Sequence, residues 1–195
     1  MLFRSGVIDA AECPPTYGTD PELIQAIIAG GEKAIFNAAE GDEDNEKAGR
    51  DVIKGKNVAS IDTVIGITAS GRTPFVLGAI QEAKTVGAFT IGLCNNTSTS
   101  LTEICDISIV PEVGPEVVMG STRMKSGTSQ KLVLNMISTS VMIKLGKVYG
   151  NLMVDLNPNN EKLMHRATRI ISLATDLAPE EAYNYLMQSG KNPKI

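Results

Sequence analysis

One strand–helix–strand segment constrains the fold more than any other part of the chain. A short apolar run, Asp62–Ile67, is followed by a helical pattern that opens with Thr73 and Pro74. A threonine N-cap with proline at the first helical position is typical of a helix start. Gly87 then ends the helix, and Ala88–Cys94 returns as a second apolar run. Two strands joined through a helix form a parallel pair, so the sequence predicts an α/β fold on a parallel sheet.

The α/β alternation continues along the chain. Ser100 and Glu103 have the spacing of a capping box for a short helix, and Ile107–Val113 follows as a third strand. Ser126–Gly146 predicts a long helix that is apolar on most sides, as expected of one held between a sheet and another layer or a second subunit. We therefore expect a parallel sheet sandwiched by helices.

The two ends of the chain have a different character. Past Pro158, two charged amphipathic helices are predicted at Glu161–Thr175 and Pro179–Met187. We expect one domain over residues 1–156 and a small helical appendage over 157–195. In the N-terminal part, residues 22–28 and 33–39 fit either a strand or a helix, and residues 43–53 predict a charged helix.

Composition and charge exclude several classes of function. The chain of 195 residues has 18 Lys and Arg against 22 Asp and Glu, a net charge of -4, and no basic run, which disfavours a nucleic-acid surface. The apolar stretch Leu132–Ile143 is well short of the ~20 residues that a membrane span needs. No signal-peptide pattern is found at the N-terminus, so we expect a cytoplasmic protein without membrane contact.

Cysteine and histidine give little support for a metal site or for thiol chemistry. The three cysteines, Cys13, Cys94 and Cys105, share no ligand spacing, and the one histidine, His165, falls in a predicted surface helix. We expect reduced thiols and no metal. Acid and base chemistry would then rest on carboxylates.

The loop Thr68–Pro74 is the first candidate site. It follows a parallel strand and opens a helix, the place where open α/β sheets bind ligands. Its hydroxyls and the free N–H groups of a helix N-terminus suit a phosphate. A tight turn would also explain Gly71 and Thr73, but phosphate binding is the favoured interpretation.

The loop Gly114–Gln130 is the second candidate. Ser121, Thr122, Arg123 and Lys125 gather hydroxyls and two cations just before the long helix. A solvated basic loop explains this composition equally well. Together with the first loop, it indicates a ligand with a phosphate and several hydroxyls.

Carboxylates form the third and fourth candidates. Pro14-Pro15 directly follows Glu12 and Cys13, and we expect a rigid loop that holds the Glu12 carboxylate in one direction. Cys13 is a weaker candidate because no histidine lies near it in sequence. The acidic run from Glu40 to Glu46, which includes Glu43, usually marks a solvated helix start.

Four motifs in order resemble the bacterial N-acetylmuramic acid 6-phosphate etherases. They are Asp9–Tyr17, Ala38–Asp44, Ala69–Pro74 and Gly120–Lys131, and the likeness continues through Lys147–Asp155. The resemblance implies a sugar isomerase (SIS) fold and a homodimer without metal or organic cofactor. It also implies a carbon–oxygen lyase that cleaves the D-lactyl ether by elimination and hydration, giving N-acetylglucosamine 6-phosphate and D-lactate in cell-wall recycling.

The resemblance also assigns roles by motif position. Glu12 matches the glutamate that protonates the departing lactate oxygen, and Glu43 matches the base that removes the C2 proton. Ser70, Gly71 and Thr73, with the backbone of Arg72, look like the phosphate cradle. The sugar or lactate contacts would come from Ser121, Arg123 and Lys125.

The resemblance leaves three alternatives to the enzyme: a sensor, an inactive fragment, and an SIS enzyme with another substrate. Family members carry an N-terminal helical region and a first strand upstream of the Glu12 motif, so we expect this chain to be shortened at both ends. A non-catalytic sugar-phosphate sensor would share the Ser121–Lys131 signature without using Glu12 and Glu43. An SIS enzyme acting on another sugar phosphate would keep the Ser70 loop without the Glu12 motif.

Overall fold

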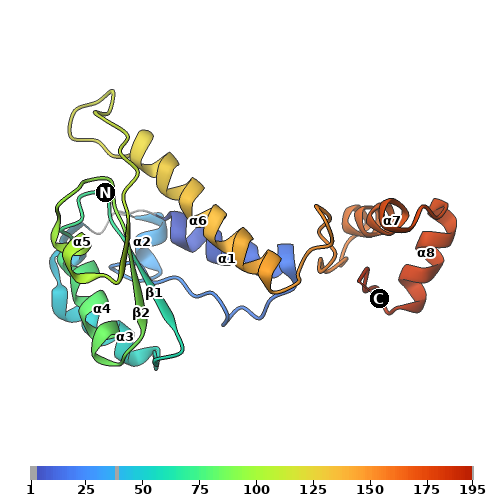
Figure 1. Cartoon of the computed structure of the whole chain (residues 1–195), viewed down its shortest axis with the longest axis horizontal. Coiled ribbons are helices and arrows are strands. Elements are labelled where there is room, and N and C mark those ends of the chain that lie inside the picture. Colours follow the sequence, from blue (N-terminus) through green and yellow to red (C-terminus); the bar gives the residue numbers. More distant parts are fainter. Residues whose placement is uncertain (1–3, 38–39, 195) are drawn as a thin grey trace. The chain divides into compact units, whose positions relative to one another are not determined.

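The computed structural model describes residues 4–37 and 40–194 (Figure 1). The regular elements are α1 (Ser5–Tyr17), α2 (Lys33–Phe36), the 3-10 helix η1 (Glu40–Asp44), α3 (Glu46–Gly55), β1 (Thr63–Ile67), α4 (Pro74–Thr85), β2 (Phe89–Leu93), α5 (Ser100–Ile104), β3 (Ile107–Ile109), α6 (Lys125–Lys144), α7 (Glu161–Thr175) and α8 (Pro179–Gln188). They form two compact units, Met1–Val7 with Ala26–Leu134 and Ile8–Gln25 with Asn135–Ile195. The predicted division into residues 1–156 and 157–195 stays a prediction.

The first unit contains the predicted parallel sheet. Its order is β1-β2-β3, and all pairs are parallel, with Ile65 opposite Ile91 and Ile91 opposite Ile107. β3 is shorter than predicted. Cys94 N donates to Ile109 O at 3.2 Å, and Pro111, two residues further on, has no N–H with which to extend the ladder.

Helix α4 covers one face of the sheet. Val64 packs into the apolar clusters that contain Ile80 and Ala83 of α4. A Cβ at Gly66 would lie 2.9 Å from side-chain carbons of both Ile80 and Val76, so the strand needs glycine where the helix approaches it. The α/β architecture is therefore confirmed at its central β–α–β unit.

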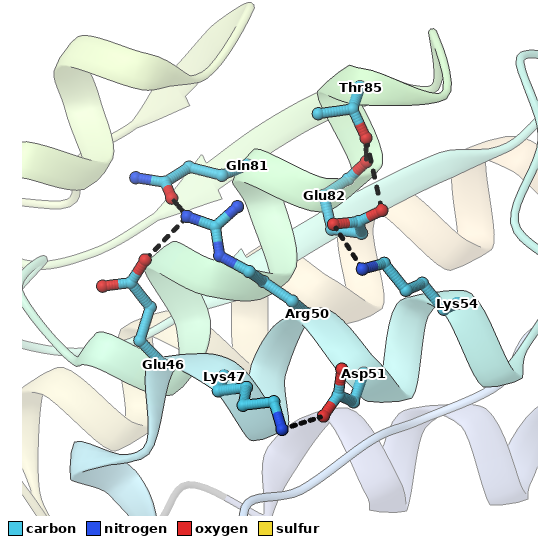
Figure 2. A network of polar contacts seen from close by, with 8 residues as sticks. All are labelled: Glu46, Lys47, Arg50, Asp51, Lys54, Gln81, Glu82 and Thr85. Carbon is cyan, nitrogen blue, oxygen red and sulfur yellow. Dashed lines mark hydrogen bonds and ion pairs between the residues drawn. The ribbon is translucent and has the colours of Figure 1, made fainter.

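Helices α3 and α4 lie side by side next to the sheet (Figure 1). Glycine permits this contact: a Cβ at Gly49 would lie 2.0 Å from Phe75 O, and one at Gly78 would lie 2.1 Å from Glu46 O. The solvent side of the contact carries polar pairs, and Figure 2 shows Arg50 of α3 between Glu46 and Gln81. Close backbone packing, more than these partly exposed pairs, holds the two helices together.

The second unit contains its own apolar core. The buried residues Val154, Leu156, Ala167, Ile170, Ile171, Ala182 and Leu186 cluster around α7 and α8. Lys194 then donates to Asp155 Oδ2 at 3.0 Å and to Gly146 O at 2.9 Å, which ties the last described residue to this unit. The two C-terminal helices are confirmed, α7 as predicted and α8 one residue longer.

The expected loop around Glu12 is wrong. Residues 9–16 belong to α1, which runs through Pro14 and Pro15 to Tyr17. Each proline has a helical φ but removes an N–H donor and crowds the carbonyl four residues earlier, and both stand in the last turn, where little helix follows them. Helix α1 continues until Gly18, whose φ of +59° ends it and whose N–H bonds to Pro14 O at 2.9 Å.

Three helix boundaries also differ from the predictions. Helix α3 begins at Glu46 with Asn45 as its N-cap, so Glu43 belongs to η1 instead. The capping box of α5 uses Thr99 and Thr102, one residue before the predicted pair. Residues 33–36 form a helix and residues 22–28 form neither helix nor strand, while residues 38 and 39 lie outside the described part.

Within residues 4–37 and 40–194, no helix is both long and apolar enough to cross a bilayer. No group of three or more His, Cys, Asp or Glu side chains in the same ranges could hold a metal ion.

Candidate functional site

Three hydroxyls gather where β1 ends. Thr68 Oγ1 lies 2.7 Å from Thr73 Oγ1 and 3.3 Å from Ser70 Oγ, and Ser70 Oγ also accepts the Arg72 N–H at 3.2 Å. The loop thus brings the predicted residues Ser70, Arg72 and Thr73 together. Thr68 was not singled out by the sequence reasoning, although a hydroxyl directly after a predicted strand was its signal.

Position 71 requires glycine for two reasons: its backbone conformation and the lack of room for a Cβ. Its φ is +69°, in the left-handed region that favours glycine. A Cβ at this position would lie 2.3 Å from Thr99 Oγ1 and 2.6 Å from Thr99 Cβ. The loop therefore packs directly on the N-cap residue of α5.

Helix α4 begins inside the loop without a side-chain cap. Thr73 precedes Pro74 as predicted, but its hydroxyl makes no capping hydrogen bond because it points to Thr68. The amide donors of the first turn of α4 therefore receive no side-chain oxygen from Thr73, although Leu77 N donates to the Thr73 carbonyl at 3.0 Å. A helix N-terminus with such donors favours an anion, and Ser70 and Arg72 are exposed beside it.

In the second candidate loop, a side chain of the loop itself caps the start of the following helix. Glu116 accepts hydrogen bonds from Lys125 N and Ser126 N, both at 3.2 Å, at the start of α6. Lys125 Nζ donates to Pro115 O at 2.8 Å. In the structure the Glu116 carboxylate occupies this helix end, and contact of an external anion with the loop stays a prediction.

The remaining residues of this loop are arranged as a turn. Arg123 N donates to Ser121 Oγ at 3.3 Å, so these two predicted residues are adjacent. The Arg123 side chain is exposed, and Ser121 is half-buried. No signal in the sequence singled out Glu116, because it precedes the helix that it caps by nine residues.

The two predicted catalytic glutamates lie in different units of the chain. Glu43 is half-buried in η1 of the first unit, and its Oε1 is shielded from solvent. Glu12 is exposed on α1 in the second unit, one turn after Asp9. Asp9 Oδ1 accepts hydrogen bonds from Asn135 Nδ2 at 2.6 Å and Ser138 Oγ at 3.0 Å, which anchors α1 to α6.

Cys13 lacks the setting of a nucleophile. Burial raises the pKa of its thiol, and the nearby Asp9 carboxylate raises that pKa further. The thiol donates to Asp9 O at 3.2 Å. A thiol held in its protonated form is a poor nucleophile, which agrees with the preference for Glu12.

Two hollows of the surface lie away from these loops. One of about 470 Å³ is lined by Lys84, Phe89 and Asp106 among others, at the amino ends of the strands. Another of about 250 Å³ belongs to the second unit and includes Asp155 and Lys191. Because open α/β sheets bind ligands at the carboxyl ends of their strands, the Thr68–Thr73 loop remains the candidate site.

The fold agrees with the comparisons with known proteins. The SIS domain family model matches residues 48–140. Models described as the glucokinase regulatory protein N-terminal SIS domain and the C-terminal lid domain of glucokinase regulatory protein match residues 11–84 and 150–194. The chain is thus an SIS-type α/β protein.

Curated relatives indicate a narrower group within the SIS-type proteins. The chain is 60% identical over 98% of its length to an N-acetylmuramic acid 6-phosphate etherase of Clostridium acetobutylicum, of which it covers 64%. It is 56% identical over 98% of its length to the etherase of Clostridium beijerinckii and 53% identical, also over 98%, to etherase 1 of Bacillus licheniformis, covering 63% of each. The chain is therefore homologous to the N-acetylmuramic acid 6-phosphate etherases and spans somewhat under two thirds of their length.

Proposed function

We propose that this chain binds a sugar phosphate, with the phosphate group at the Thr68–Thr73 loop. The hydroxyl cluster of Thr68, Ser70 and Thr73 beside the uncapped start of α4 is the observation that carries the proposal. Three hydroxyls and the amides of a helix N-terminus can donate to several phosphate oxygens at once. The exposed Arg72 adds a positive charge next to the loop.

The substrate of the proposal is N-acetylmuramic acid 6-phosphate. The relatives at 50–60% identity carry the name of the etherase of this compound. In the proposed reaction, a base takes the C2 proton of the open-chain sugar and the C3–O bond breaks. Water then adds across the resulting double bond, which gives N-acetylglucosamine 6-phosphate and D-lactate.

The proposed acid and base are Glu12 and Glu43. A weakly acidic C–H bond and an alkoxide leaving group call for one base and one acid, each contributing about 10²–10⁴-fold. The shielded Oε1 of Glu43 supports a place inside a site rather than on the solvated surface. Glu12 supplies the proton to the departing lactate and then assists the addition of water.

The proposal includes a cytoplasmic homodimer that needs no metal or organic cofactor. Apolar side chains on the exposed part of α6 support the dimer: Leu132 is 49% exposed, Met136 59% and Ile143 53%. A second copy of the chain that covered them would remove this apolar area from water.

A regulatory sugar-phosphate sensor is the second candidate. The two matches to parts of a glucokinase regulatory protein favour it, since the name of that protein describes regulation rather than catalysis. The relatives named etherase match 98% of the chain, at 60% and 56% identity, and favour the enzyme. Both candidates bind a sugar phosphate, and only the enzyme releases lactate.

Release of D-lactate from N-acetylmuramic acid 6-phosphate tests the proposal. We expect the purified chain to release it and Glu43→Gln to lower the rate at least about 100-fold while N-acetylglucosamine 6-phosphate still binds. Asp44→Asn, an exposed acid in the same 3-10 helix, is the matched control and keeps the rate. Binding without release supports the sensor, and an unchanged rate in Glu43→Gln rejects the proposed base.

A further inference from the structure

A polar network joins the three strand ends of the sheet to helix α6. Asn95, directly beyond β2, donates through Nδ2 to Pro111 O at 3.0 Å, past β3, and to Ser129 Oγ at 2.9 Å on α6. Its backbone N–H donates to Ala69 O at 3.0 Å, past β1. One residue thus contacts the segments after β1 and β3 and the first turns of α6.

The orientation of the Asn95 amide is fixed by a group that can only accept. Pro111 O is a carbonyl, so the Asn95 nitrogen must face it and the Asn95 oxygen must face the other way. That oxygen accepts from Gln130 Nε2 at 2.9 Å. Gln130 is fully buried on α6, and it therefore presents its amide nitrogen to Asn95.

Only the nitrogen of the Gln130 amide has a hydrogen-bond partner among the described residues. Gln130 Oε1 is buried and accepts no hydrogen bond from any described residue. A buried acceptor without a donor is unfavourable, whereas an apolar side chain of similar shape would avoid that penalty. Gln130 is therefore poorly explained by stability and better explained by what its nitrogen does.

Asn95 and its neighbour also hold the candidate phosphate loop. Ala69 O, the carbonyl just before Ser70, accepts both Asn95 N and Asn96 Nδ2, the latter at 2.8 Å. Neither asparagine belongs to the hydroxyl cluster itself. Their bonds fix the peptide from which Ser70 and Gly71 project.

We propose that Gln130 and Asn95 are positioning residues for the phosphate loop. Gln130 fixes the Asn95 side-chain amide, and Asn95 N and Asn96 Nδ2 hold Ala69 O, the carbonyl that precedes the hydroxyl of Ser70. The start of α6 is thereby coupled to the loop at β1. This inference rests on the proposed phosphate site only for its functional consequence, because the coupling exists without a ligand.

Amide hydrogen exchange tests the coupling without any ligand. In Gln130→Met we expect the amides of Asn95 and Arg72 to exchange about tenfold faster, as lost preorganisation of the loop requires. The melting temperature should change little, because the lost donor to Asn95 Oδ1 is offset by the removal of the buried unpaired acceptor of Gln130. If Gln130 served stability alone, Gln130→Met would lower the melting temperature. Exchange at these two amides would then rise no more than in the rest of the sheet.

Two other variants make the outcome decisive. Gln81→Met makes the same substitution at a half-buried glutamine of α4 that bonds to Arg50, and it should leave the Asn95 and Arg72 amides unchanged. Ser129→Ala removes the hydroxyl that accepts from Asn95 Nδ2, while alanine favours the helix in which it stands. This variant should also speed exchange at the same two amides. Unchanged exchange in both Gln130→Met and Ser129→Ala would overturn the inference.

Titration with inorganic phosphate separates this inference from the proposed function. We expect the unmodified chain to bind phosphate with shifts at the loop amides, and Gln130→Met to bind about tenfold more weakly. Absence of phosphate binding to the unmodified chain would count against the proposed site, while the exchange result would still decide the coupling.

Discussion

Thr68 Oγ1 lies 2.7 Å from Thr73 Oγ1, so the residue that starts helix α4 gives its hydroxyl to the preceding strand end and not to the helix. A threonine in this position normally accepts a hydrogen bond from its own helix. The hydroxyls of the loop thus lie together at the carboxyl end of β1, directly before the first amides of α4. This relationship makes the loop a phosphate cradle in our interpretation.

Thr68→Val tests the hydroxyl pair. The substitution keeps the shape of a 5% exposed side chain and removes one hydroxyl, so we expect about tenfold weaker binding of phosphate and a stability loss of about 1 kcal/mol. Thr90→Val is the control, because the Thr90 hydroxyl bonds to Asp106 at 2.7 Å at the opposite end of the sheet. Titration calorimetry and urea unfolding of both variants make the comparison. Equal affinity in Thr68→Val and the unmodified chain would contradict the cradle.

Gly71→Ala should destabilise the chain more than backbone strain alone explains. Gly71 and Gly31 have φ values of +69° and +66°, so alanine costs about 1–2 kcal/mol at either position. Only at Gly71 does the new Cβ collide with Thr99, which adds about 1–3 kcal/mol. Gly31→Ala meets open space and is the matched control. Equal unfolding free energies for the two variants would show that the contact with Thr99 does not matter.

Gly78→Ala should lower stability although alanine is the better helix former. The gain in helix propensity is about 1 kcal/mol, but the Cβ would lie 2.1 Å from Glu46 O and force α3 and α4 apart. We expect a net loss of about 1–3 kcal/mol in chemical unfolding. Gly55→Ala, at the end of α3 with nothing within 4 Å, should instead raise stability by up to about 1 kcal/mol. Stabilisation in both variants would refute close backbone packing of the helices.

Asp106 should make the stability of the chain fall in acid. Hydrogen bonds from the side chain and the backbone of Thr90, followed by Lys84, lower the pKa of the Asp106 carboxyl. Its contribution is present above the unfolded pKa of about 3.9 and is lost as the pH falls through the lower folded pKa. Melting curves below about pH 4 should therefore show a shallower decline in Asp106→Asn. An equal decline in Asp106→Asn and the unmodified chain would contradict this contribution.

Local patterns in the sequence were sufficient for the β–α–β core. Apolar runs and the Thr73-Pro74 and Gly87 signals predicted β1, α4 and β2 within a residue or two, because each signal acts on its own neighbours. Gly87, with a φ of +79°, ends the helix as predicted. Phosphate binding at the loop stays a prediction.

Features set by distant residues escaped the sequence reasoning. The cap of α6 comes from Glu116, and the close contact of α3 with α4 depends on Gly49 and Gly78, which no local pattern relates. Pro14-Pro15 indicated a loop because proline opposes helices in general. The structure continues α1 through both prolines, and α1 is also held to α6 by Asp9 across more than 120 positions of sequence.

Binding of N-acetylglucosamine 6-phosphate, followed by backbone amide shifts, addresses the proposed site itself. We predict saturable binding with the largest shifts at Ser70, Gly71 and Arg72, and little or no binding of unphosphorylated N-acetylglucosamine at the same concentration. Equal binding of the two sugars, or saturable binding that leaves these three amides unshifted, would contradict a phosphate site in this loop.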